Sequence, residues 1–243
     1  MQSIWFERRA IASLAIIVAL GLGAVGAQAV TISPVLVDLS PTRRIVSITI
    51  SNPGDTAISY QAQTLAWTQV EGIDQFADSD ALLVTPAIAN IPAGGAQIFR
   101  VASRLPPVTS EQAYRLIFED ISELAKPLGQ QMTVTLRVNH NLPVFLTASG
   151  DSRALPKMTA CNKPAAIGMG CLRIENQGDR YLQISGLSFG DAGNRRKIAL
   201  SGRVLAGAWK QFEFALPKNA STPPHLEVAS SAGPIAMGSP GAP

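Results

Sequence analysis

The chain has 243 residues, of which 47% are hydrophobic and 15% charged, and its formal net charge is +3. So small a net charge excludes the concentrated basic face that a nucleic-acid-binding protein needs. The length is sufficient for a targeting segment followed by one large β domain or two domains of about 100 residues each.

The first 29 residues have the pattern of an export signal. Arg8 and Arg9 form a charged start, residues 10–25 are small and apolar, and Ala27-Gln28-Ala29 is a small-x-small cleavage site. The apolar part is shorter than the roughly 20 residues that span a bilayer, which argues against an uncleaved anchor. We expect a signal peptide over 1–29 and a mature protein that begins at Val30, without stable membrane insertion.

Short β-type runs separated by turn residues fill the next part of the chain. The number and spacing of these runs are typical of an immunoglobulin-like sandwich, which we expect over 30–148. Ile48 and Ile50 are predicted to point inward. The expected strands are Val30–Val37, broken by Pro34, then Arg44–Ser51, Ile58–Trp67, Leu82–Val84, Gln97–Val101, Ala113–Ile121 and Met132–Leu146.

A smaller β unit is predicted over 149–229. Ile50-Ser51-Asn52-Pro53-Gly54-Asp55 recurs as Ile174-Glu175-Asn176-Gln177-Gly178-Asp179, and Ala93-Gly94 is mirrored by Ala206-Gly207. These echoes suggest two related sandwiches in tandem. The segment 230–243, rich in Gly, Pro, Ala and Ser, is predicted to be a disordered tail.

The two cysteines, Cys161 and Cys171, both lie in the exported part of the chain. An oxidising compartment and a short loop between them favour a disulfide over two free thiols. Two cysteines and two distant histidines, His140 and His225, do not have metal-ligand spacing, so no metal site or cofactor is expected.

The segment Met132–Val138 alternates strictly between apolar and polar residues. This period places Met132, Val134, Leu136 and Val138 on one face of a strand. Pro143 has no N–H for a ladder and therefore indicates an edge strand or a bulge. Such a face either covers the domain's own core or pairs with another chain.

The sequence contains no nucleophile motif and no glycine-rich phosphate loop, and the acidic cluster Glu119, Asp120 and Glu123 fits a solvated rim. We therefore expect a binding protein and no enzyme.

Several motifs in a fixed order resemble the PapD-like pilus chaperones of the chaperone/usher pathway, and most of all the archaic branch. They are Ile50-Ser51-Asn52, Ile91-Pro92-Ala93-Gly94-Gly95 before Gln97-x-x-Arg100, Glu111-Gln112-Ala113-Tyr114-Arg115-Leu116, and Leu142-Pro143-Val144-Phe145. The resemblance implies an all-β fold of two tandem immunoglobulin-like β-sandwiches in a boomerang arrangement, located in the periplasm.

The resemblance also implies a mechanism. The chaperone lends its seventh strand to an incomplete pilin-like subunit and delivers that subunit to an outer-membrane usher. Its donor residues here would be Met132, Val134, Leu136 and Val138. Whether the free protein self-associates through this strand is left open.

The family anchors the subunit's terminal carboxylate on basic residues between the domains. At the two usual positions this chain has Pro34-Val35-Leu36 and Leu142-Pro143, which are apolar. Arg115 is the substitute that we expect, because a guanidinium grips a carboxylate with two hydrogen bonds; Arg100 and Arg137 are weaker candidates. The alternative function is an exported immunoglobulin-like adhesin or structural subunit, which would keep its last strand for its own core.

Overall fold

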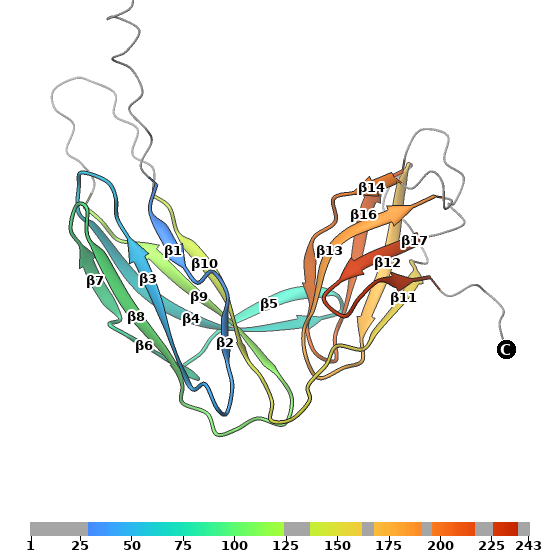
Figure 1. Cartoon of the computed structure of the whole chain (residues 1–243), viewed down its shortest axis with the longest axis horizontal. Helices are drawn as coiled ribbons and strands as arrows, with labels where there is room; N and C mark the ends of the chain where they lie inside the picture. Colours follow the sequence, from blue (N-terminus) through green and yellow to red (C-terminus); the bar gives the residue numbers. More distant parts are fainter. Residues whose placement is uncertain (1–28, 124–136, 162–167, 191–195, 217–225, 238–243) are drawn as a thin grey trace, which may run out of the picture.

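The computed structural model describes residues 29–123, 137–161, 168–190, 196–216 and 226–237, and every regular element within them is a β-strand. The strands form four sheets, two in each half of the molecule, and the halves meet at an angle (Figure 1). The expected all-β fold of two tandem sandwiches is thus confirmed. In the part of the chain that is described, no helix has the length and apolar character needed to cross a membrane.

The first domain contains ten strands in two sheets. One sheet has the order β1-β3-β8-β6, and the other has the order β2-β10-β9-β4-β5 with β7 paired to β4. The bounds are β1 (Thr31–Ser33), β2 (Val37–Leu39), β3 (Ile45–Ser51), β4 (Ile58–Val70), β5 (Ile73–Asp78), β6 (Leu82–Thr85), β7 (Ile88–Ile91), β8 (Ala96–Ser103), β9 (Gln112–Asp120) and β10 (His140–Leu146).

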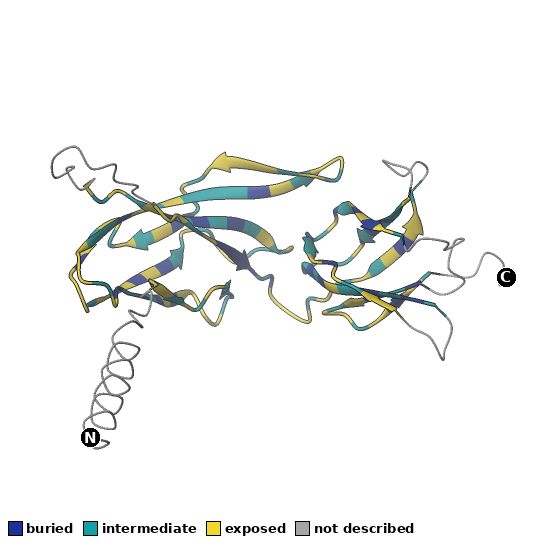
Figure 2. Ribbon diagram, turned by 90° about the horizontal axis from the view of Figure 1, so that it is seen from above, coloured by how far each residue is buried: buried dark blue, intermediate teal, exposed yellow. Residues whose placement is uncertain are grey.

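Alternation along the strands builds the core of this domain. In β3, Val46, Ile48 and Ile50 are buried, as predicted for the two isoleucines, while the residues between them face outward. Buried and more exposed positions alternate along many strands of the molecule (Figure 2). In β9 the buried positions are Tyr114, Leu116 and Phe118. The odd-numbered residues of β9, among them Arg115, therefore lie on the outer face of the sheet.

The second domain contains a sheet of order β11-β12-β16 and a sheet of order β14-β13-β17-β18, in which β15 also pairs with β13. Its strands are β11 (Pro156–Ala160), β12 (Met169–Asn176), β13 (Leu182–Phe189), β14 (Arg196–Ile198), β15 (Gly202–Val204), β16 (Trp209–Ala215), β17 (Leu226–Ser230) and β18 (Ile235–Ala236). As predicted, Cys161 and Cys171 form a disulfide.

The repeat seen in the sequence is a repeat of structure. Asn52 and Asn176 are buried, and each side-chain amide donates to three backbone carbonyls while its oxygen accepts the N–H two residues on. The two turns that face them also match, since Gly94 and Gly207 have φ values of 67° and 68°. Such agreement of hydrogen bonds and backbone supports two related sandwiches.

The structure differs from the expected elements in several places. The strand β5, which forms a hairpin with the predicted β4, and the strands β7, β11 and β15 were not predicted. Residues 230–237, assigned to the tail from the sequence, include β18, which pairs with β17 and buries Ile235. Of the expected strand Met132–Leu146, the described strand is β10 from His140 onward, and residues 1–28, 124–136 and 238–243 lie outside the described part.

Candidate functional site

The strand β10 is paired on both sides along only part of its length. On one side it pairs with β9 from His140 to Leu146, whereas on the other side β2 pairs in parallel with Val144 to Leu146. β1, which precedes β2 in the chain, pairs with β3 in the opposite sheet. Within the described residues, positions 140–143 of β10 therefore form an edge, and Pro143 lies within it as the sequence predicted.

The core of the first domain reaches this edge. Leu142 is buried in the core cluster. Ile32 of β1 in the opposite sheet, and Val30 just before β1, pack against the same cluster while remaining partly exposed. The Tyr60 hydroxyl and Nε2 of His140 lie 3.3 Å apart at the beginning of β10. The open side of the sandwich is thus apolar. It lies next to β10, whose register is fixed by its pairing with β9.

The expected donor residues stand just before this edge. Val138 is described and is 48% exposed, and Met132, Val134 and Leu136 lie outside the described residues. Val138 has the same parity as Leu142, which faces the core. Arg137 is exposed and donates from Nη2 to the carbonyl of Ser122 at 2.6 Å.

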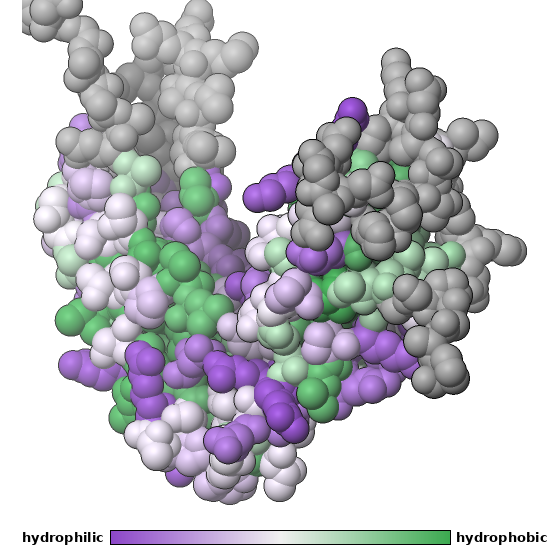
Figure 3. Space-filling view, turned by 45° about the vertical axis from the view of Figure 1, so that its right-hand side comes forward, coloured by the Kyte–Doolittle hydropathy of each residue, from purple (hydrophilic) through white to green (hydrophobic). Residues whose placement is uncertain are grey.

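The second domain packs against the outer face of the sheet that contains β10. Trp67 of β4 and Phe145 of β10 form a buried cluster with Leu205 and Ala208. The ring of Phe145 stacks on Tyr181, with centroids 3.9 Å apart and planes at 14°. Figure 3 shows the hollow between the two domains above this contact, with apolar side chains on the adjacent first-domain surface.

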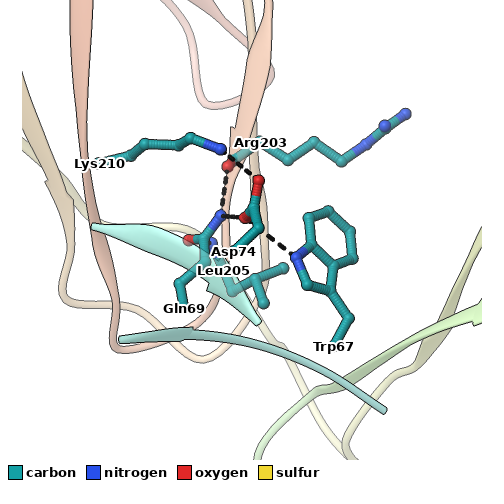
Figure 4. Close-up of polar contacts among 6 residues, drawn as sticks. All are labelled: Trp67, Gln69, Asp74, Arg203, Leu205 and Lys210. Carbon is teal, nitrogen blue, oxygen red and sulfur yellow. Dashed lines mark hydrogen bonds and ion pairs between the residues drawn. The ribbon is translucent and has the colours of Figure 1, made fainter. Parts of the chain in front are cut away.

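A polar network joins the β4–β5 hairpin to the second domain (Figure 4). Asp74 of β5 accepts hydrogen bonds from Trp67 Nε1 at 3.0 Å and Gln69 Nε2 at 2.8 Å, and its other oxygen lies 2.5 Å from Lys210 Nζ. Gln69 also donates to the Arg203 carbonyl at 2.9 Å. Burial alone would raise the pKa of Asp74, but these donors and the Lys210 charge hold it below its usual value.

Arg115 lies on the outer face of β9, beside this network. Its guanidinium carbon is 3.9 Å above the Trp67 ring and 5.9 Å from the Phe76 ring. Burial, and then the charge of Arg203, lower the pKa of Arg115. Within the described residues, Nε of Arg115 and Nε of Arg203 are both buried without a hydrogen-bond partner. Two guanidinium groups from different domains thus each have a buried Nε without a partner among the described residues.

The structure does not bring the three predicted arginines together. Arg100 belongs to β8, in the sheet on the far side of the sandwich, where it is exposed and pairs in register with Ser47 and Thr85. Arg137 lies near the open edge and bonds to Ser122. Of the predicted anchor residues, only Arg115 lies beside the contact between the domains.

Reasoning from the sequence missed Asp74, Arg203 and Lys210. They come from an unpredicted hairpin and from another domain, and no motif links them to Arg115. No pattern in the sequence indicates that Lys210 of β16 reaches the first domain.

The acidic residues Glu111 and Asp38 also lie at the contact between the two domains. Glu111 accepts a hydrogen bond from the Tyr181 N–H at 2.7 Å, and its own N–H donates to the Asp179 carbonyl at 3.2 Å. Among the described residues, Oε2 of Glu111 and Oδ1 of Asp38 are buried without a partner. An open pocket of about 370 Å³ adjoins Glu111, Trp67 and the 205–208 turn, and neither Arg115 nor Arg203 lines it.

Comparison with known proteins agrees with this geometry. Residues 29–150 match the family model of the pili and flagellar-assembly chaperone, PapD N-terminal domain. A search of curated proteins found no match.

Solved structures share the fold over most of the chain. A structure of the CsuC–CsuE chaperone–tip adhesion subunit pre-assembly complex, from the archaic chaperone-usher Csu pili of Acinetobacter baumannii, matches with 19% identity and a TM-score of 0.65, over 86% of this chain and 98% of that chain. The complex of SafA pilin with the SafB chaperone of Salmonella enterica gives 15% identity and a TM-score of 0.57, over 88% and 98%. The class 5 fimbriae chaperone CfaA gives 15% identity and a TM-score of 0.55, over 86% and 98%.

The family match covers half of the chain, and it includes β10 and its open edge, β9 with Arg115, and the β4–β5 hairpin. The chain therefore belongs to the family of PapD-like pilus-assembly chaperones.

Proposed function

We propose that this protein is a periplasmic chaperone that binds pilin-like subunits by donor-strand complementation and delivers them to an outer-membrane usher. The observation that carries the proposal is the open half of β10, residues 140–143, which directly follows the alternating segment 132–138. A strand edge with unpaired backbone groups beside an apolar seam is suited to pair with another chain.

The proposed donor face follows from the register of β10. Leu142 faces the core of the first domain, so a strand that continues upstream would place Val138, Leu136 and Val134 on that same face. A subunit that lacks its last strand would receive these side chains in its groove. The core of the chaperone and the core of the subunit would then be continuous across the seam.

The energy available from this face is sufficient for specific binding. Burying an apolar side chain of this size contributes about 1.5–3 kcal/mol, so three or four donors would supply several kcal/mol before the cost of ordering the segment. A shift of one residue would turn Arg137 into the apolar groove, and this penalty fixes the register.

We place the anchor for the subunit's terminal carboxylate at Arg115, together with Arg203. Both side chains carry an unused buried donor and come from opposite sides of the cleft. The Trp67 ring supports the Arg115 guanidinium from below at 3.9 Å and leaves its planar edge for a carboxylate. The two arginines repel each other, and a bound carboxylate would relieve that repulsion.

Handover to the usher needs no nucleotide in this mechanism. Folding energy that the subunit has not released in the chaperone complex drives exchange of β10 for the extension of the next subunit. The absence of a phosphate loop from the sequence is consistent with this role.

Co-expression with the small pilin-like protein encoded beside this one tests the proposal. Wild type is compared with Leu136→Arg and with the matched control Thr135→Arg, which places the same charge on the opposite face of the strand. We expect soluble complex from wild type and from Thr135→Arg, and at least a tenfold loss from Leu136→Arg. Circular dichroism verifies that each variant is folded.

The other outcome favours the alternative function. If Leu136→Arg binds as well as wild type, or if wild type binds no neighbouring subunit, the strand serves the domain's own core. The protein would then be an exported immunoglobulin-like adhesin or structural subunit.

A further inference from the structure

Beside the two arginines of the proposed anchor, the domain contact also contains the ion pair of Asp74 and Lys210. Arg115, Arg203 and Lys210 lie around Asp74, whose negative charge is close enough to raise the pKa of Arg115 against the larger lowering effect of burial. An unpaired carboxylate at this position would attract the Arg115 guanidinium. A subunit carboxylate would then have to displace it.

In the structure, Lys210 pairs with Asp74, so Asp74 does not compete with a subunit carboxylate. Its ammonium lies 2.5 Å from Oδ2 of Asp74, while Oδ1 is taken by Trp67 Nε1 and Gln69 Nε2. Figure 4 shows the ammonium directed at Asp74, whereas the Arg203 side chain extends past it. The pair is only partly screened by solvent, since the side chains of Lys210 and Asp74 are 25% and 28% exposed.

The same pairing holds the ring that supports Arg115. Trp67 is 3% exposed, and its indole N–H is fixed by Asp74. Arg115 lies over the face of that ring. Oδ1 of Asp74, as the acceptor of the Trp67 N–H, therefore helps to position the ring on which Arg115 rests.

We propose that Lys210 is a positioning residue that keeps the carboxylate anchor open: by occupying Asp74 it leaves Arg115 and Arg203 free for the subunit's terminal carboxylate. This inference rests on the proposed function, because it presupposes that Arg115 and Arg203 bind that carboxylate. It adds that the second domain controls the selectivity of the anchor through a residue that never contacts the ligand.

The test uses the full mature protein and two synthetic peptides. Both have the last 15 residues of the neighbouring pilin-like subunit, one as the free acid and one as the carboxamide. The measured quantity is the ratio of the two dissociation constants, which reports recognition of the carboxylate alone. The variants are Lys210→Met, Asp74→Asn, the double variant Lys210→Met/Asp74→Asn, and the conservative Lys210→Arg.

We expect Lys210→Met to reduce the preference for the free acid about three- to tenfold, because the released Asp74 competes for the arginines. Asp74→Asn keeps the preference, the double variant restores it, and Lys210→Arg retains it. A residue with a merely structural role would weaken both peptides equally, and removing Asp74 as well would not restore binding.

Two results overturn the inference. One is a double variant that is as defective as Lys210→Met alone, and the other is an unchanged ratio in Lys210→Met. Arg115→Met and Arg203→Met separate these outcomes from failure of the anchor itself: if neither changes the ratio, the proposed anchor is wrong, whatever Lys210 does.

Discussion

Glu111 lies where the two domains touch, and this position changes its protonation. Burial, assisted by the charges of Asp38 and Asp179, raises the pKa of Glu111 to about 7, against the opposing effects of the Tyr181 N–H and of Arg180. The domain contact therefore favours the protonated carboxyl. In an unfolded chain the same group would titrate near 4.5.

The sign of the pH dependence follows from the raised pKa. The contribution of Glu111 to stability is fully present below about pH 4.5 and is lost as the pH rises through about 7. We expect the free energy of unfolding, measured in urea at several pH values from 5 to 8, to fall with rising pH. Glu111→Gln keeps an oxygen to accept the Tyr181 N–H and should flatten this slope.

A slope that is the same in Glu111→Gln and wild type would contradict this assignment. Glu119→Gln is the matched control, since Glu119 is on the same strand but exposed, and it should retain the wild-type slope.

Residues such as Asn52 and Asn176 show what a sequence can reveal at this scale. Their repeated motifs predicted two related domains, and the structure shows that the motifs repeat because both amides satisfy the same buried turn. Arg115, which the sequence singled out, lies over the Trp67 ring at the contact between the domains, and its anchor role stays a prediction. Arg203 and Lys210 could not be found, because their closeness to Arg115 depends on the angle between two domains that are separate in the sequence.

The hairpin of β4 and β5 is the element that connects the domains. Its tip contains Glu71 and Gly72, which have positive φ values of 50° and 77°. A Cβ on Gly72 would lie 2.6 Å from Cζ3 of Trp209 in the second domain. The tip thus needs glycine both for its backbone and for close contact with the indole ring.

Gly72→Ala is therefore expected to push the hairpin tip away from Trp209 and to destabilise the protein by about 2–3 kcal/mol, from backbone strain plus the displaced contact. Urea unfolding measures the loss. Gly94→Ala is the matched control, since Gly94 has a φ of 67° but nothing within 4 Å of the added Cβ, so it should cost about 1 kcal/mol. Equal losses in the two variants would show that the contact with Trp209 has no energetic role.

This hairpin also explains a limit of prediction from the sequence. The residues of β5 are exposed in all but one position, so the strand has no apolar periodicity to reveal it. The strands β3 and β9 were predicted correctly because one of their faces is buried throughout. For β10 the sequence indicated an edge through Pro143. It did not indicate that β2 pairs with only half of β10, because this depends on where the chain crosses from the sheet of β1 to the sheet of β2.

At the scale of the whole molecule, the two domains contact each other beside the open edge of β10. The aromatic contact of Phe145 with Tyr181, the Asp74 network and the Glu111 contact hold the second domain against the outer face of the sheet. The open edge of β10 lies on the same sheet. A subunit bound to this edge would therefore have its last residues close to Arg115, which pairs in register with Pro143.

Amide hydrogen exchange, measured by mass spectrometry on the free protein and on its complex with the neighbouring pilin-like subunit, tests donor-strand complementation most directly. The account predicts that peptides covering residues 132–143 become strongly protected on binding, because their backbone groups join the ladder of the subunit. Peptides from the sheet on the far side of the sandwich, such as those of β3 and β8, should change little in their exchange rate. A stable complex in which residues 132–143 exchange as fast as in the free protein would contradict the account.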